Sequence, residues 1–174
     1  PSPNVLGVGL SGQMHGSVLL DKAAIESGGR DAPALRPALL WNDQRTAAQC
    51  DEIERALGGR RALVQLVGNA ALTGFTLPKI LWIREHEPQV FARAATIMLP
   101  KDYIRFRLTG EVATDVGDGA GTLVMDVDNR AWSERMCTAV DLDPALLPRI
   151  VESAETTAPL SAWAAAQLGL QAGV

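Results

Sequence analysis

Short apolar runs and longer amphipathic segments alternate along this chain. The run at residues 5–10 places apolar side chains next to one another, which is typical of a central strand covered on both faces, and residues 17–20 are a second, short candidate strand. Residues 97–99 and 122–126 are further candidate strands, and residues 38–41 are extended and apolar. Strands that alternate with helices indicate the α/β class, which is the predicted fold class.

Apolar residues at three- and four-residue spacing predict helices between these strands. The expected helices cover residues 43–57, 78–86, 88–94, 100–108, 133–140 and 161–168, and a further short one begins after residue 143. Asp43, Ser133 and Ser161 are candidate N-caps, because a short side-chain oxygen can accept from the free amides of the first turn. The glycine-rich residues 114–121 are expected to form a turn that leads into strand 122–126. Because helices outnumber strands, we expect a small or incomplete sheet.

The composition fits one globular domain, with at most a short extension, and excludes several classes of partner. A chain of 174 residues with 47% hydrophobic residues can bury a core. The net charge of −4 and the scattered basic residues argue against a nucleic-acid surface. No apolar run reaches membrane-spanning length and no signal-peptide pattern is visible, so we expect a cytoplasmic protein with no membrane partner.

The residues that could bind metal ions do not form a metal-binding motif. Cys50 and Cys137 are expected to be reduced, partly buried thiols, since no second cysteine or histidine lies at ligand spacing from either. Asp115 and Asp118 lie among glycines, but their spacing fits neither an EF-hand nor a P-loop. We therefore interpret the two carboxylates as part of a structural turn, and no metal site is predicted.

The loop Gly12-Gln13-Met14-His15-Gly16 follows the first predicted strand. In open α/β sheets, ligands bind beyond the carboxyl ends of the strands. The two glycines allow a tight turn close to a ligand, and Gln13 and His15 carry donors and acceptors suited to sugar hydroxyls. The residues alone leave two interpretations of His15 open: a turn histidine satisfied by the backbone, or a ligand contact.

Trp41, Asp43 and Arg45 stand where an extended segment meets a predicted helix. The indole of Trp41 can lie against the apolar face of a sugar, or it can be a core aromatic. Asp43 can cap the helix, bind a hydroxyl, or do both. Arg45 is expected to be an ion-pair partner.

Residues 74–86, Gly-Phe-Thr-Leu-Pro-Lys-Ile-Leu-Trp-Ile-Arg-Glu-His, resemble the signature segment of the FGGY carbohydrate kinases. Residues 12–16 are similar to the sugar loop of the xylulose kinases in that family, and residues 41–45 to its Trp-x-Asp-x-Arg segment. The resemblance implies a packed helix in which Lys79 is able to pair a carboxylate. The substrate-binding residues that it implies are Met14, His15, Gln13, Trp41 and Asp43.

The resemblance also implies a ribonuclease-H-like fold, related to actin and hexokinase, in which two domains close on a cleft. Residues 1–160 would be an incomplete N-terminal, sugar-binding domain with helical insertions that lacks its first strands. Residues 161–174 would be a helix and the start of a connection to a C-terminal ATP-binding domain. The absent strands and C-terminal domain are the expected partners within the same enzyme.

The family's phosphate loop should lie before residue 1, and its aspartate general base after residue 174. The resemblance therefore implies ATP and Mg²⁺ as cofactors of the full-length enzyme, whereas this chain is expected to bind neither and to contain no catalytic residue.

The implied activity is ATP-dependent phosphorylation of D-xylulose to D-xylulose 5-phosphate by the parent enzyme, with this chain inactive alone. Two alternatives stay open: another FGGY specificity, such as ribulose, gluconate or glycerol, and a non-catalytic sugar-binding domain. The Gln-Met-His loop favours xylulose, because glycerol kinases carry an Arg-Glu pair in the matching loop. A homodimer stays open as an assembly.

Overall fold

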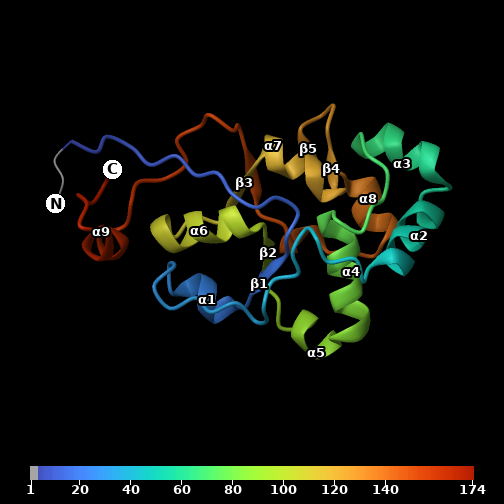
Figure 1. The fold of residues 1–174 in the computed structure, drawn as a ribbon, viewed down its shortest axis with the longest axis horizontal. Helices are drawn as coiled ribbons and strands as arrows, with labels where there is room; N and C mark the ends of the chain where they lie inside the picture. The colour runs from blue at the N-terminus through green and yellow to red at the C-terminus, as the bar shows by residue number, and fades with distance from the viewer. Residues whose placement is uncertain (1–3) are drawn as a thin grey trace.

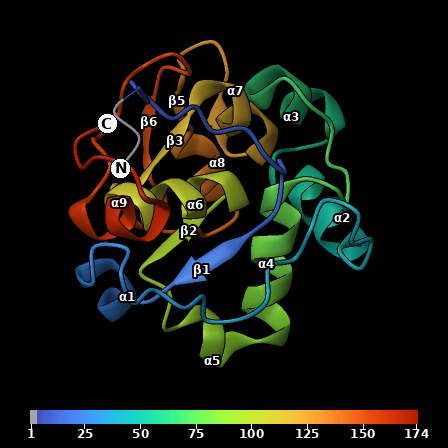
Figure 2. The same ribbon diagram turned by 60° about the vertical axis from the view of Figure 1, so that its left-hand side comes forward.

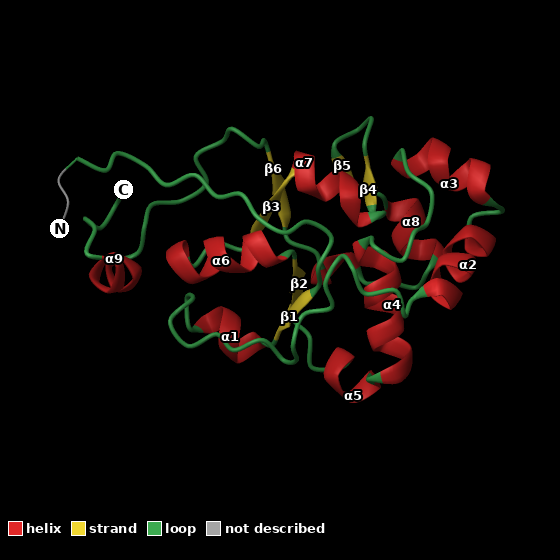
Figure 3. Ribbon diagram, in the orientation of Figure 1, coloured by secondary structure: helices red, strands yellow, loops and turns green. Residues whose placement is uncertain are grey.

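A computed structural model describes residues 4–174, which form a body rich in helices around small sheets (Figure 1; Figure 3). Its α-helices are α1 (Lys22–Glu26), α2 (Ala47–Ala56), α3 (Arg60–Val67), α4 (Thr76–His86), α5 (Pro88–Phe91), α6 (Pro100–Thr109), α7 (Val116–Gly119), α8 (Glu134–Ala139) and α9 (Ala162–Leu168). Its strands are β1 (Val18–Leu20), β2 (Thr96–Met98), β3 (Ala113–Asp115), β4 (Met125–Asp126), β5 (Ala131–Trp132) and β6 (Arg149–Val151), and two 3₁₀ turns are η1 (Ala120–Thr122) and η2 (Pro144–Leu146).

The central strand pair, β1 and β2, is antiparallel, with Leu19 opposite Ile97. Val18 and Leu20 pack with residues of α1 and α6, whereas Leu19 and Ile97 belong to the core around α4 (Figure 2). β3 pairs with β6 in parallel, and β4 pairs with β5 antiparallel. The predicted short strand at residues 17–20 is confirmed as β1, and its three apolar residues are all buried.

Helix α4 forms the centre of the main core. Its buried apolar side chains include Leu77, Ile80, Leu81 and Ile83, which pack with residues of α2, α3 and α8. Apolar residues all round a helix predict burial on every side, and the predicted helix is confirmed. The fully buried Lys79 is the polar exception on this helix.

The predicted caps of two further helices are confirmed. The hydroxyl of Ser133 accepts from the amide of Met136 at 3.1 Å, and that of Ser161 accepts from the amide of Ala164 at 3.2 Å. These bonds satisfy first-turn amides of α8 and α9 that have no partner within their helix.

The predicted strand at residues 5–10 is wrong. This segment runs past α7 toward β1 without pairing to any strand among residues 4–174 (Figure 1), and Leu6 is 93% exposed. A strand needs a hydrogen-bonded neighbour, and apolar character alone does not supply one.

The predicted turn at residues 114–121 is also wrong, because this stretch holds the end of β3, the short helix α7 and most of η1. The Asp115 carboxylate accepts from the amides of Gly117 and Asp118 at 2.9 and 3.1 Å, and thereby begins α7. The expected strand over 122–126 shrinks to β4, which holds two residues.

Besides α7, two further helices, α1 and α3, were not expected from the sequence. The carboxylate of Asp21 caps α1 by accepting from the amide of Ala24 at 2.9 Å. Asp21 therefore carried a usable signal for α1. Gly59, with φ of +117°, precedes α3, and a left-handed Gly68 ends it.

The two cysteines are thiols without a disulfide partner, as expected. Cys50 and Cys137 are free and buried, and burial raises the pKa of both thiols. None of the helices within residues 4–174 combines the length and the apolar character that a membrane span needs.

Candidate functional site

Two of the predicted site segments leave the same end of a short backbone pairing. Ser17 and Leu39 form an isolated antiparallel bridge, in which the amide of Ser17 donates to the carbonyl of Leu39 at 3.1 Å. Residues 12–16 precede Ser17 and residues 41–43 follow Leu39. Because the two chains run antiparallel, both segments emerge on the same side of the bridge.

His15 has a left-handed backbone, with φ of +65°. Its ring packs edge-on against Phe75, with 4.8 Å between the ring centroids and an interplanar angle of 75°. The Nδ1 atom is buried and has no hydrogen-bond partner within residues 4–174. A non-glycine residue in this conformation costs about 1–3 kcal/mol and persists where its surroundings fix it, often at functional sites.

The surroundings of His15 favour a neutral imidazole. Burial has the largest influence and lowers the pKa of His15, and the positive charge of Lys79 lowers it further. The nearby backbone of Gly121 and the carboxylate of Asp118 raise it, but the Gly121 backbone is not in hydrogen-bonding geometry with the ring, which leaves Nδ1 without a partner. The net pKa lies below the usual value for histidine. A neutral imidazole offers one donor and one acceptor, which suits a sugar hydroxyl.

Gly74 and Phe75 connect the two site segments. A Cβ atom on Gly74 would lie 3.1 Å from the carbonyl oxygen of Trp41, so the absence of a side chain allows this close approach. Phe75, the next residue, contacts the ring of His15. The segment before α4 thus touches both the 12–16 loop and the turn at Trp41.

The side chain of Lys79 binds the backbone of this connecting segment. Its Nζ atom donates to the carbonyls of Thr73, Gly74 and Phe75 at 2.7, 2.7 and 2.9 Å. The expected pairing of Lys79 with a carboxylate is therefore wrong: three backbone carbonyls take that place. Burial lowers the pKa of Lys79 to about 8.

The other predicted site residues lie at the surface. Met14 is 49% exposed and Trp41 is 52% exposed, and Gln13 is also exposed. Trp41 is therefore not a core aromatic. These side chains are accessible to a ligand, and their role in substrate binding stays a prediction.

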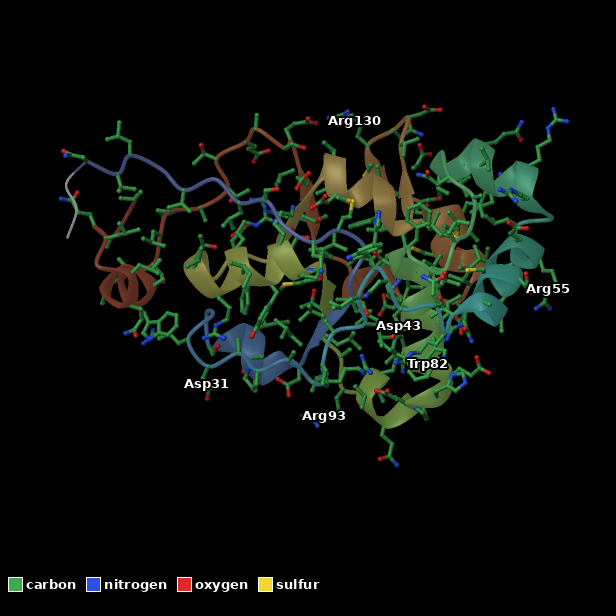
Figure 4. The ribbon with its side chains drawn as sticks, viewed as in Figure 1. Asp31, Asp43, Arg55, Trp82, Arg93 and Arg130 are labelled. Carbon is green, nitrogen blue, oxygen red and sulfur yellow. The ribbon has the colours of Figure 1, made fainter. Side chains whose placement is uncertain are left out.

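Asp43 does not cap α2, contrary to the prediction, because the helix begins at Ala47. Its carboxylate accepts from the backbone amide and Nε of Arg45, at 3.1 and 2.8 Å, which confirms the expected role of Arg45 as an ion-pair partner. The Arg45 guanidinium also lies 4.7 Å from the ring centre of Trp82 in α4, so Asp43 lies near this helix (Figure 4). Asp43 is half-buried and is held in place by this arginine.

A buried charge cluster lies behind the 12–16 loop and was missed by the sequence analysis. The ammonium of Lys101 lies 3.0 Å from Asp102 and 3.2 Å from Asp118, and it also donates to Asp115. Gly12 lies above this lysine, because a Cβ added there would be 3.5 Å from the Cβ of Lys101. The sequence signal was the Lys101-Asp102 pair at a helix start, but only the fold brings the other two carboxylates to it.

This charge cluster does not fit Mg²⁺, because Lys101 already lies among the three carboxylates. Within residues 4–174, no group of three histidine, cysteine, aspartate or glutamate side chains is arranged to hold a metal ion.

The charge cluster predicts an acid-sensitive contribution to stability. Burial opposes ionisation of Asp115, but hydrogen bonds from Lys101, the backbone and Ser153 outweigh it and lower the pKa of Asp115 to about 2. Because the pKa in the folded chain lies below the unfolded value of about 3.9, the stabilisation is complete above that value and is lost as the pH falls toward 2. We expect the difference in unfolding free energy between the wild type and Asp115→Asn to shrink between about pH 4 and pH 2.

Urea unfolding across this pH range measures the effect, and Asp31→Asn is the matched control. Asp31 is exposed at the outer edge of the molecule (Figure 4). A difference for Asp115→Asn that stays constant with pH would contradict the assigned role of Lys101.

Comparison with known proteins identifies the family that this chain matches. The sequence profile of the N-terminal domain of the FGGY family of carbohydrate kinases matches residues 1–174. A xylulose kinase of Klebsiella pneumoniae is 43% identical over 157 residues, which cover 90% of this chain and 30% of that protein. The chain spans about a third of the length of the curated relatives that it matches.

Solved structures agree with this assignment. The crystal structure of a xyloylose kinase from Brucella ovis aligns with a TM-score of 0.85 and 38% identity, covering 98% of this chain and 33% of that one. A gluconate kinase from Lactobacillus acidophilus aligns with a TM-score of 0.86 but 21% identity, covering 100% of this chain and 34% of that one, and therefore supports the fold alone. These alignments confirm the predicted α/β, ribonuclease-H-like fold class. With a family match along its whole length, the chain belongs to the FGGY family of carbohydrate kinases.

Proposed function

We propose that this chain is the sugar-binding part of a kinase that transfers phosphate from ATP to D-xylulose and forms D-xylulose 5-phosphate. The xylulose kinases among its relatives support the reaction, and the family match over residues 1–174 supports a place in the N-terminal domain. The division of the chain into residues 1–160 and a connecting segment at residues 161–174 stays a proposal. ATP and Mg²⁺ would be bound by other parts of the enzyme, and the general base would also lie there.

The observation that carries this proposal is the state of His15. A neutral imidazole is held by Phe75 in a left-handed loop, with a buried Nδ1 that lacks a partner in the described chain. A buried nitrogen without a partner is costly, and a bound hydroxyl would relieve that cost. His15 would bind sugar hydroxyls, and Met14 would supply a backbone contact and an apolar wall.

Gln13, Trp41 and Asp43 would support the sugar from the neighbouring surface. The exposed indole of Trp41 would lie against C–H groups of the sugar, and the Asp43 carboxylate, oriented by Arg45, would accept from a hydroxyl. These residues would bind and orient D-xylulose, while closure of a second domain would exclude water.

The test is the substrate specificity of the kinase that contains this segment. We expect kcat/KM for D-xylulose to exceed the values for ribulose, gluconate and glycerol, because the relatives with the higher identities are named xylulose kinases. Coupled measurement of ADP release with each substrate gives these values, and the 174-residue chain assayed in parallel should give only background turnover.

Each other outcome has a defined meaning. A preference for ribulose, gluconate or glycerol would keep the kinase assignment and reject the xylulose assignment. Binding of D-xylulose without turnover by the complete protein would favour a non-catalytic sugar-binding domain.

A further inference from the structure

The imidazole of His15 occupies the space that a side chain on Gly121 would fill. A Cβ atom built on Gly121 would lie 2.2 Å from Cε1, 2.5 Å from Nδ1 and 3.4 Å from Nε2 of His15. Real Cβ atoms essentially never approach another heavy atom closer than 3.0 Å, so a side chain here and the observed ring position exclude each other. The segment before β1 passes α7 (Figure 2), and Gly121 lies in η1, directly after that helix.

The backbone at Gly121 does not itself require glycine. Gly121 lies within η1 and is not among the glycines with positive φ. The three heavy atoms nearest to its added Cβ all belong to His15. The position of the His15 ring therefore requires a residue without a side chain here, whereas the conformation of the turn around Gly121 does not.

The ring is also fixed by its other neighbours. Phe75 packs edge-on against it, and the Lys79 ammonium holds the Phe75 carbonyl at 2.9 Å. The left-handed backbone at His15 sets the direction in which the side chain leaves the loop. With Phe75 and the loop backbone in place, a methyl group on Gly121 would leave the ring no room in its present position.

We propose that Gly121 is a positioning residue for sugar binding, whose missing side chain sets where the His15 imidazole stands in the substrate site. This inference rests on the proposed function of His15. To restore the 3.0 Å minimum, the ring in Gly121→Ala must move by about 0.8 Å, the difference between 3.0 and 2.2 Å.

In the kinase that contains this segment, Gly121→Ala should raise the KM for D-xylulose by about 10-fold, a smaller effect than the roughly 100-fold loss of rate that a 1 Å misplacement can cause. The KM for ATP should stay unchanged. Gly7→Ala is the matched control, because nothing lies within 4 Å of an added Cβ there and its φ is not positive. An unchanged KM for D-xylulose in Gly121→Ala would overturn the proposal.

A double-mutant cycle separates positioning from a general structural effect. With His15→Ala in place, the clash is gone, so adding Gly121→Ala should change the KM for D-xylulose no further. A further 10-fold rise in that background would show that Gly121 acts through another group, and would overturn the proposal. This comparison holds even where Gly121→Ala alone folds poorly, because the double variant has no clash.

A readout on the ring itself keeps the inference distinct from the proposed activity. Proton NMR of the complete enzyme, with His15→Asn identifying the signal, follows the His15 imidazole. Lys79 and Asp118 are the charged groups that act on this ring, and burial dominates. Gly121→Ala should push the ring outward and move its pKa toward the ordinary histidine value, while the His86 signal stays in place.

If Gly121→Ala leaves the NMR signal and the pKa of the His15 imidazole unchanged, Gly121 does not position the ring. This conclusion holds for any substrate of the enzyme. A shifted signal in an enzyme that does not act on D-xylulose would instead reject the proposed function and keep the assigned placement of the ring.

Discussion

Replacing Lys79 with methionine is expected to lower the free energy of unfolding by about 3 kcal/mol. The side chain is fully buried, and its ammonium donates three hydrogen bonds to the carbonyls of Thr73, Gly74 and Phe75. Methionine fills a similar volume but leaves those carbonyls without a donor, and the relief of burying a charge offsets only part of the loss. Chemical denaturation at neutral pH measures the difference.

Lys22→Met is the matched control, because the Lys22 side chain is 85% exposed and makes a surface pair with Glu26. We expect it to change stability little, since exposed pairs of this kind contribute about 0.3–0.5 kcal/mol. Equal losses of unfolding free energy in the two variants would contradict the proposed contribution of the Lys79 hydrogen bonds to stability.

The lowered pKa of Lys79 also determines how the free energy of unfolding changes with pH. The pKa of Lys79 is about 8 in the folded chain, below its value of about 10.4 when unfolded. Between these values the unfolded chain binds more protons, so the wild type gains stability relative to Lys79→Met as the pH rises from about 8 to about 10.4. A difference that falls over this range would show that the folded chain holds the proton more tightly than the burial of Lys79 implies.

Local patterns in the sequence were sufficient for the elements that local forces determine. The all-round apolar character of α4 predicted its burial, and Ser133 and Ser161 marked helix starts because capping involves residues three apart. Asp43 failed as a cap for an equally local reason: its carboxylate binds Arg45, two residues away, instead of the first turn of α2.

Features that depend on residues distant in sequence could not be predicted in this way. Residues 5–10 have the composition of a strand, but pairing depends on a neighbour that no local pattern specifies. Gly121 meets His15 across more than a hundred residues, and nothing in the turn around Gly121 marks the ring that requires it. The resemblance to a kinase family identified the candidate residues of the loop, whereas the residues that contact and position His15 were found only in the structure.

Removing the His15 side chain should have the largest effect on sugar use. In the complete enzyme, His15→Ala is expected to lower kcat/KM for D-xylulose by about 100-fold and to leave the KM for ATP unchanged, because the imidazole is proposed to orient the sugar alone. Steady-state kinetics with each substrate varied in turn separates the two parameters. His86→Ala is the matched control, since His86 ends α4 and stacks on Trp82 at the surface, with 4.5 Å between ring centroids.

The backbone of His15 requires a second substitution to interpret this result. Alanine at φ of +65° is strained, whereas asparagine adopts the left-handed region readily and keeps the loop conformation. Equal losses in His15→Ala and His15→Asn would therefore assign the effect to the imidazole. A loss confined to His15→Ala would assign it to the loop, and D-xylulose kinetics unchanged in both would make His15 a turn histidine, so that the buried Nδ1 would have no part in recognising the sugar.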